Sequence, residues 1–284
     1  MGLRGVKEYL RPSRLDEALA LLRERGERAW PIGGGIDLVL FAPREVEAVV
    51  DLGRLPLRYV RENEGRISIG AIATLREVLE SPVVRDYLGG VIPEMLHQVA
   101  SPLLRNLATI GGTLVSANPW SDVITLFLAL GAEVVLSDGK TRTIPLEKLY
   151  PARALRGTIL TEVRLPSSAR ESAAAFWKFS RTAFDVALLN CATFVRMVGG
   201  RCVEARVVAG GTPQLGARLP RAEACLVGSG LDDASIERAA EAARESADVR
   251  EDRRASADYR RELVLVGVKR SLHEARGRLA GGER

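Results

Sequence analysis

Two glycine-rich segments hold the residues best suited to chemistry in this chain of 284 residues. The first spans residues 32–38 and contains three consecutive glycines, Gly33, Gly34 and Gly35. Consecutive glycines let the backbone adopt positive φ and approach a ligand closely, and their N–H groups can then point at one anion. The segment therefore predicts a backbone site for a phosphate or a diphosphate, with an ordinary turn as the alternative.

The second segment spans residues 109–113 and contains the pair Gly111 and Gly112. It predicts the same chemistry, and residues 116–122 then supply small polar groups able to hold the edges of a ribose and an adenine. A tight turn followed by a capped helix is the alternative. Two such segments in one chain favour a dinucleotide, because a single backbone nest rarely surrounds a diphosphate.

Two other nucleotide-binding motifs lack their required spacing. Residues 33–38 do not have the G-x-G-x-x-G pattern of a Rossmann turn. Gly139, Lys140 and Thr141 match the end of a P-loop, but Val134 stands where its upstream glycine is needed. Both motifs are therefore rejected.

The cysteines and histidines form no recognisable set of metal ligands. They are few and far apart in the sequence: Cys191, Cys202, Cys225, His97 and His273. Zinc and iron–sulfur sites need such ligands at short, regular spacings. We therefore predict no metal site, and we interpret the cysteines as small apolar core residues.

The composition is that of a globular protein, with 46% hydrophobic and 27% charged residues. The net charge is +5, but the basic residues are scattered and only 5% of the residues are aromatic, which argues against a nucleic-acid surface. No apolar stretch approaches the roughly 18 residues that a membrane-spanning helix needs. The first residues include Glu8 and no apolar run, so we expect a cytoplasmic, soluble protein without a secretory signal.

Hydrophobic spacing predicts the elements that must position the two segments. A helix is expected at residues 13–25, with Ser13 as its N-cap, and another begins at Thr74, where Glu77 completes a capping box. Further helices are expected at residues 122–130, 221–227, 234–247 and 259–279. Residues 86–104 are expected to be mainly helical, with interruptions at Pro93 and Pro102. Strands are expected at residues 48–51, 66–69, 132–136, 141–144, 158–165, 176–180, 186–198 and 202–209, and a linker at 167–172. This pattern predicts an α+β protein.

The sequence resembles the FAD-binding medium subunits of molybdenum hydroxylases, the family of carbon monoxide dehydrogenase, xanthine dehydrogenase and aldehyde oxidoreductase. Residues 33–38 are similar to the family's first glycine turn and residues 105–122 to its second, which is long and specific. Matches at residues 157–163, 176–185, 209–213, 259–261 and 269–270 extend the resemblance over essentially the whole chain. The chain departs from the family pattern at Gly33, at Ile36, where a threonine hydroxyl is lost, and in having no inserted cysteine cluster.

The resemblance implies a two-lobed, PCMH-like FAD-binding domain at residues 1–170, with lobes at about 1–55 and 56–170. A smaller domain of antiparallel strands with helices would follow at residues 171–284. Both glycine segments would bind the FAD diphosphate through N–H groups, and Asp122 would hold the sugar or adenine end. Lys178 would lie near the N1/C2=O edge of the flavin, where its cation favours the reduced form. The residues assigned to FAD by the resemblance are Ile32, Gly33, Gly34, Gly35, Ile36, Asp37, Leu38, Val99, Ala100, Thr109, Gly111, Gly112, Thr113, Ala117, Asn118, Ser121, Asp122, Ile159, Leu160, Lys178 and Asp185.

The function implied by the resemblance is electron transfer inside a larger oxidoreductase. An iron–sulfur small subunit and a large subunit with the molybdenum cofactor would be the partners, in a dimer of heterotrimers, and this chain would pass electrons to an external acceptor. It would hold no acid–base catalyst and no metal. One alternative is a free-standing FAD-dependent oxidase or reductase, which would need a base or nucleophile over the flavin; His97 and Cys191, just outside the matched segments, are the candidates for it. A second is a basic binding protein that has lost its flavin.

Overall fold

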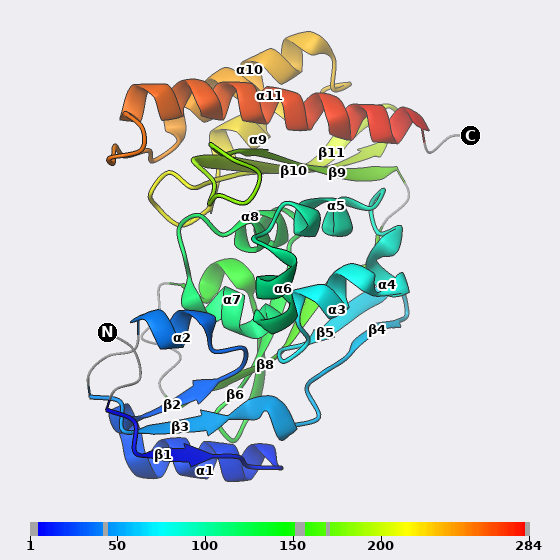
Figure 1. The fold of residues 1–284 in the computed structure, drawn as a ribbon. Coiled ribbons are helices and arrows are strands. Elements are labelled where there is room, and N and C mark those ends of the chain that lie inside the picture. Colours follow the sequence, from blue (N-terminus) through cyan, green and yellow to red (C-terminus); the bar gives the residue numbers. More distant parts are fainter. Residues whose placement is uncertain (1–4, 42–44, 151–156, 169–170, 282–284) are drawn as a thin grey trace. The chain divides into compact units, whose positions relative to one another are not determined.

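The computed structural model describes residues 5–41, 45–150, 157–168 and 171–281 (Figure 1). The chain divides into two compact units. Unit 1 comprises Met1–Ser81, Ser101–Ser116 and Glu133–Leu165, and unit 2 comprises Pro82–Ala100, Ala117–Ala132 and Pro166–Arg284. The chain therefore passes repeatedly between the units, and segments 82–100 and 117–132 pack with the C-terminal residues rather than with their neighbours in sequence.

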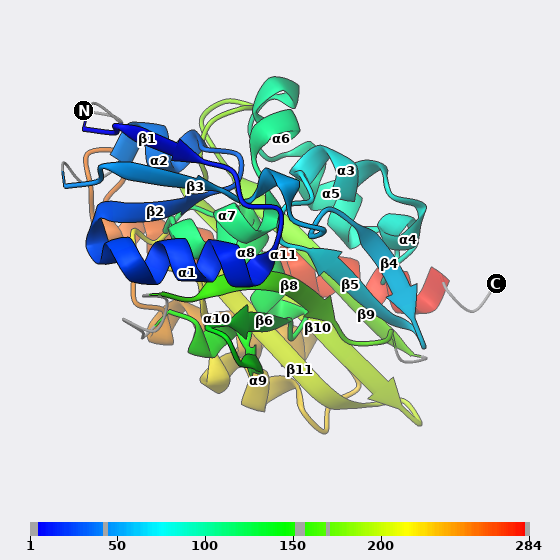
Figure 2. The same ribbon diagram turned by 90° about the horizontal axis from the view of Figure 1, so that it is seen from below.

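The N-terminal part of unit 1 is a three-stranded parallel sheet with one helix on it (Figure 2). The strands lie in the order β1 (Glu8–Leu10), β3 (Ala48–Asp51) and β2 (Ala29–Ile32), and α1 (Leu15–Arg25) packs on β2 and β3. Ala18, Leu19 and Leu22 recur on one face of α1 and are buried against the sheet. The predicted cap at Ser13 is wrong, because Arg14 is the N-cap residue and Ser13 only donates its N–H to the Glu17 carboxylate, at 3.1 Å.

The rest of unit 1 is built on a five-stranded antiparallel sheet with the strand order β4-β5-β8-β6-β7. Its strands are β4 (Val60–Asn63), β5 (Arg66–Gly70), β6 (Glu133–Ser137), β7 (Thr141–Pro145) and β8 (Ile159–Leu165). The helices are α2 (Ile36–Phe41), α3 (Leu75–Glu80), α6 (Pro102–Leu107) and α7 (Ile110–Ser116), and the short 3-10 helices are Gly26–Arg28, Leu52–Arg54 and Leu146–Lys148. The capping box predicted for Thr74 and Glu77 is confirmed at the start of α3.

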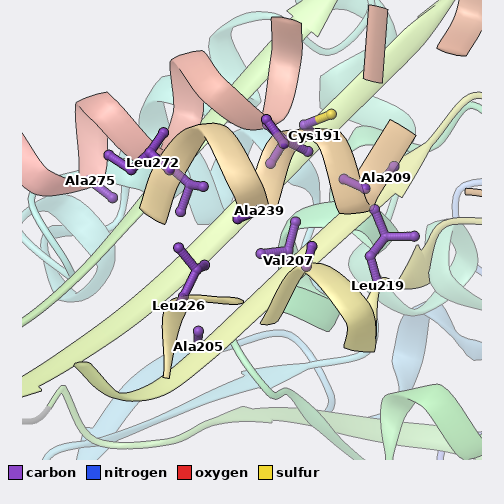
Figure 3. Close-up of a cluster of buried hydrophobic side chains, with 14 of the residues drawn as sticks. Cys191, Ala205, Val207, Ala209, Leu219, Leu226, Ala239, Leu272 and Ala275 are labelled. Carbon is purple, nitrogen blue, oxygen red and sulfur yellow. The ribbon is translucent and has the colours of Figure 1, made fainter. Parts of the chain in front are cut away.

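Unit 2 is centred on a four-stranded antiparallel sheet with the order β12-β11-β10-β9. The strands are β9 (Ser172–Phe179), β10 (Leu189–Val198), β11 (Arg201–Gly210) and β12 (Ala217–Arg218). Three helices, α9 (Pro220–Leu226), α10 (Asp233–Ser246) and α11 (Ala257–Gly281), cover one face (Figure 1). Apolar side chains from this face and these helices form the core, among them Cys191, Val207, Leu226 and Leu272 (Figure 3).

The other face of this sheet carries α8 (Asp122–Ala129), which packs on β10 and β11, and α5 (Val91–His97), which packs on β9. The short α4 (Pro82–Arg85) precedes α5. All eight residues of α8 are buried, as expected for a helix in which only Asp122 and Thr125 are polar.

Prolines and glycines account for the main local errors of the sequence analysis. The interruption predicted at Pro93 is wrong, because Pro93 lies in the first turn of α5, where its missing N–H is not needed. The interruption predicted at Pro102 is confirmed, because α5 ends at His97 and α6 begins at Pro102. Gly111 and Gly112, predicted as a turn, lie in the first turn of α7.

Two strand boundaries also differ from the prediction. The strand predicted from residue 186 begins at Leu189, and the strand predicted from residue 176 begins at Ser172. Residues 169–170 of the predicted linker lie outside the described residues.

One buried arginine ties the C-terminal helix to the loops of unit 2. Arg260, on α11, is fully buried, and its guanidinium donates to Leu188 O, to Gly211 O at 2.5 Å and to Asp252 Oδ1 at 2.7 Å. Burial alone would raise the pKa of the Asp252 carboxyl, but hydrogen bonds from Arg254 and Arg260 hold it well below its usual range.

No helix in the described part of the chain is long and apolar enough to cross a membrane.

Gly267, in the middle of α11, is predicted to be essential for the packing of unit 2. A Cβ there would lie 2.5 Å from Trp177 Cε3 and 2.8 Å from Cys191 Sγ. Gly267→Ala should therefore destabilise the protein by roughly 1–3 kcal/mol through overpacking, seen as a lower urea midpoint. Gly277→Ala on the same helix is the control, because nothing lies within 4 Å of its Cβ; it should be neutral or stabilising. Equal losses in the two variants would contradict the packing explanation.

Candidate functional site

The two glycine segments lie against each other in unit 1, although 70 or more residues separate them in sequence. Gly33, Gly34 and Gly35 connect β2 to α2, and Gly35 has a φ of +77°. A Cβ on Gly33 would lie 2.7 Å from Thr109 Oγ1, and a Cβ on Gly34 would overlap Leu107 O. Glycine is thus required in the first segment, because its backbone packs directly on the second.

The first segment presents unused backbone donors. The N–H groups of Gly34, Gly35 and Ile36 have no backbone or side-chain acceptor among the described residues. The C=O of Gly35 accepts from Val39 N at 2.9 Å, which fixes the entry into α2. Unpaired N–H groups on a close-packed glycine backbone are chemically suited to an anion such as a diphosphate.

The second segment uses its donors inside the protein. Gly111 N donates to Ala71 O at 2.9 Å, and Gly112 N donates to Thr109 Oγ1 at 3.1 Å. A Cβ on Gly111 would lie 2.8 Å from the Cβ of Ala71. The glycines therefore serve close packing of α7 on the residues after β5, and their N–H groups are not free as the sequence analysis supposed. Thr113 N likewise donates to Thr109 O.

The other residues of unit 1 that were predicted to bind FAD lie either in the first glycine segment or in the core. Ile32, Ile36, Asp37 and Leu38 are half-buried around the first segment. Ile159 and Leu160, on β8, are buried, and Ile159 packs in the cluster that contains Ala18, Leu19 and Ile72.

Unit 2 contains a buried ion pair formed by a lysine, and it is the only such pair among the described residues. Lys178 Nζ, at the end of β9, donates to Asp122 Oδ2, in the first turn of α8, at 2.8 Å. Their side chains are only 4% and 5% exposed, respectively. Burial raises the pKa of the Asp122 carboxyl, and the Lys178 ammonium and a hydrogen bond from Asn190 oppose this rise.

Lys178 also fixes a backbone segment that the sequence analysis assigned to the flavin. Its Nζ donates to Gln98 O at 2.8 Å, directly before Val99 and Ala100. Ala100 has a φ of +46°, a left-handed conformation that is uncommon for a residue with a side chain. An ammonium has three N–H donors, and two of them have acceptors among the described residues, so one is available to a ligand.

The residues before α8 form a second fixed loop. Ala117 has a φ of +50°, Asn118 is half-buried, and Ser121 caps α8 by accepting from Ile124 N at 3.3 Å. Pro119 O accepts from Gly211 N at 2.8 Å. These contacts connect residues 117–121 to α8 and to the residue after β11.

Asp185 differs from the other predicted residues of unit 2. It lies in the loop after β9, where its carboxylate accepts from the exposed Arg181 at 2.7 Å and from Val186 N at 2.9 Å. The hydrogen bond from Arg181 lowers the pKa of the Asp185 carboxyl. The structure does not bring Asp185 into contact with Asp122 or Lys178.

Sequence analysis missed two residues of the buried polar cluster. Asn190 Nδ2 donates to Asp122 Oδ1 at 2.7 Å, and Thr125 Oγ1 donates to Asn190 Oδ1 at 2.8 Å. Both side chains are fully buried. The available signal was one amide among the apolar residues 187–192, since a buried polar group at such a position must find a hydrogen-bond partner.

Comparisons with known proteins identify the family of the chain. Residues 4–168 match the family model described as the FAD binding domain in molybdopterin dehydrogenase, and residues 174–275 match the CO dehydrogenase flavoprotein C-terminal domain. The chain belongs to the family of FAD-binding subunits of molybdopterin dehydrogenases. The resemblance, the fold class and the FAD cofactor predicted from the sequence are thereby confirmed, as is the class of oxidoreductase subunit.

Individual relatives match over nearly their full length. The chain is 29% identical to the carbon monoxide dehydrogenase medium chain of Hydrogenophaga pseudoflava, with 96% of this chain and 98% of that one covered. It is 31% identical to the 6-hydroxypseudooxynicotine dehydrogenase complex subunit alpha of Paenarthrobacter nicotinovorans, with 94% of each covered. Among solved structures, a carbon monoxide dehydrogenase from Hydrogenophaga pseudoflava superposes with a TM-score of 0.89 at 30% identity, covering 96% of this chain and 98% of that chain.

Gly34 is predicted to be the most sensitive glycine for cofactor binding. In Gly34→Ala, the new Cβ would overlap Leu107 O and push the first segment off the second. We expect FAD binding to weaken about tenfold or more, since overpacking costs roughly 1–3 kcal/mol and about 1.4 kcal/mol is tenfold in Kd. Fluorescence titration with FAD measures the loss. Gly230→Ala is the control, because its Cβ would meet only Gly200 O, at 3.7 Å; an equal loss there would refute the explanation.

Proposed function

We propose that this chain is the electron-transfer subunit of a molybdenum-containing hydroxylase or dehydrogenase complex. It passes electrons from the iron–sulfur clusters of a small subunit to an external acceptor, while a large subunit with the molybdenum cofactor oxidises the substrate. A dimer of heterotrimers is the expected assembly. The observation that carries the proposal is a buried, paired Lys178 with one N–H left for a ligand, in a chain whose residues 4–168 match an FAD-binding domain.

FAD supplies the electron chemistry when bound, because a flavin accepts electrons singly and releases them singly or in pairs. In unit 1, the N–H groups of Gly34, Gly35 and Ile36 would hold the diphosphate, with Ile32, Gly33, Asp37 and Leu38 around them. Thr109, Gly111, Gly112 and Thr113 would support that segment, chiefly by close packing. Further residues proposed to line the cofactor are Val99, Ala100, Ala117, Asn118, Ser121, Ile159, Leu160 and Asp185.

Lys178 is proposed to act on the flavin through its charge. An ammonium buried beside a flavin stabilises negative charge there more strongly than it would in water. Asp122 keeps the lysine charged and fixed, and this differs from the role at the sugar or adenine that the sequence resemblance implied. Both of its carboxylate oxygens already accept hydrogen bonds, from Lys178 and Asn190.

Substrate oxidation is assigned to another chain because the side chains here that could act as a base or a nucleophile are poorly placed. The two candidates for a free-standing oxidase are poorly placed: Cys191 is fully buried against α11, and His97 is exposed at the end of α5. Burial also raises the pKa of the Cys191 thiol, which disfavours the reactive thiolate. The described residues contain no group of three or more histidine, cysteine, aspartate or glutamate side chains that could hold a metal ion.

Lys178→Met is predicted to lower the reduction potential of the bound flavin while FAD remains bound. Methionine retains much of the side-chain length but removes the charge that favours the reduced form. A shift of roughly 30 mV or more is expected, since about 1.4 kcal/mol corresponds to about 30 mV for a two-electron couple. Spectroscopic redox titration measures it. Lys269→Met is the matched control, because Lys269 pairs with Glu237 on the opposite side of the sheet; an unchanged potential in Lys178→Met would exclude the proposed role of the lysine.

The isolated chain carrying FAD is predicted to be inert towards organic substrates. Adding aldehydes, purines or carbon monoxide without oxygen should leave the flavin absorbance unchanged, whereas dithionite should bleach it. The reduced chain should then pass electrons to dyes or quinones. Rapid bleaching by any of the three substrates would instead favour the free-standing oxidase.

A further inference from the structure

The buried Lys178–Asp122 pair is one end of a longer series of hydrogen-bonded polar side chains. Asn190, on β10, lies directly opposite Lys178 of β9 and Gly210 of β11 in the antiparallel register. Its amide Nδ2 donates to Asp122 Oδ1 at 2.7 Å, and its Oδ1 accepts from Thr125 Oγ1 at 2.8 Å. The order of hydrogen bonds is therefore Thr125 to Asn190 to Asp122, with Lys178 on the other carboxylate oxygen.

The backbone around Asp122, Asn190 and Thr125 leaves space for these polar side chains. Asp122 and Thr125 are three residues apart on α8 and so share the face that packs on β10. A Cβ on Gly210 would overlap Thr125 Oγ1 and lie 2.5 Å from Asn190 Oδ1. A side chain at position 210 would thus occupy the space of the hydroxyl and the amide, and the strand leaves that space open.

We propose that Asn190 and Thr125 are positioning residues that set the reduction potential of the flavin by holding Asp122, and through it the charged ammonium of Lys178. The inference rests on the proposed function, because it requires Lys178 to act on the flavin. The Lys178 ammonium donates to Gln98 O and Asp122 Oδ2 and not to Asn190 or Thr125, so the effect of these two residues passes through the carboxylate.

The physical reason is the cost of a buried charge. A buried carboxylate is stable only when its oxygens are hydrogen-bonded, and otherwise it takes up a proton. Burial already raises the pKa of the Asp122 carboxyl, and Asn190 is one of the two groups that oppose this. Without the amide, the Asp122 carboxylate would lose one of its two side-chain hydrogen-bond donors, and the ion pair that holds the Lys178 ammonium in place would be displaced.

Thr125 fixes which end of the amide faces the carboxylate. The hydroxyl has one proton, and it is donated to Asn190 Oδ1, which turns Nδ2 towards Asp122. Without that hydroxyl, the amide loses the partner that selects its orientation. The effect of Thr125 should therefore have the same sign as that of Asn190 and be smaller.

The test uses Asn190→Leu and Thr125→Val, which keep the approximate side-chain volume, in the FAD-loaded chain within its complex. The control is Thr193→Val on the same strand, because Thr193 is fully buried and its hydroxyl has no hydrogen-bond partner in the described structure. Redox titration at the flavin absorbance measures the midpoint potential, and fluorescence titration measures the Kd for oxidised FAD. Both test variants should shift the potential downward with little change in Kd, and the control should shift neither.

Repeating both variants in a Lys178→Met background tests whether they act through the lysine. The proposal expects their shifts to disappear there, because no ammonium remains to be positioned. Shifts that persist unchanged, or an unchanged potential in the original background, would overturn it. If Asn190→Leu fails to fold, the midpoint potential of Thr125→Val alone tests the proposal. Loss of FAD binding in Thr125→Val would indicate a merely structural role for Thr125 and would also overturn the proposal. A failure of the proposed function is distinguishable, since Lys178→Met alone would then leave the potential unchanged.

Discussion

The buried ion pair between Lys178 and Asp122 is the constraint on which unit 2 depends. An ammonium and a carboxylate removed from water are tolerated only when each finds well-placed partners. Here the partners come from four separate elements, because Lys178 lies on β9, Asp122 on α8, Asn190 on β10, and the Gln98 carbonyl follows α5. These contacts thus join α8 and the residue after α5 to the sheet face opposite α9–α11.

Close backbone contact plays the corresponding part in unit 1. The loop after β2 can lie on residues 107–109 only because Gly33 and Gly34 have no side chains, and α7 can lie on Ala71 only because of Gly111. The two glycine motifs are therefore one packed structure, in which the second supports the first. In the first, the N–H groups of Gly34, Gly35 and Ile36 are unpaired among the described residues.

Much of this could be predicted from local sequence pattern, because periodicity and capping act between near neighbours. The capping box at Thr74 and the long apolar strands of the C-terminal part are of this kind. What failed needed knowledge of distant partners. Gly111 looked like a turn because the sequence does not reveal Ala71 beside it, and Asn190 looked unimportant because Asp122 is 68 residues away. For the same reason, no local signal assigned segments 82–100 and 117–132 to unit 2.

The polar chain behind Lys178 also explains how a single cation can be kept in an apolar region. A lone buried lysine tends to lose its proton, so a nearby carboxylate is needed to retain the charge. That carboxylate in turn weakens the field of the cation unless part of its own charge is directed elsewhere. The Asn190 amide donates to Asp122 Oδ1, the carboxylate oxygen that does not accept from Lys178. The Lys178 ammonium uses two of its N–H groups for Asp122 and Gln98 and keeps the third. A charge-assisted hydrogen bond is stronger than a neutral one, so this arrangement holds both ions in place without the mobility of exposed side chains. A site intended to stabilise added negative charge on a ligand requires such a fixed cation, because solvent or a flexible side chain would reorganise with each electron transferred.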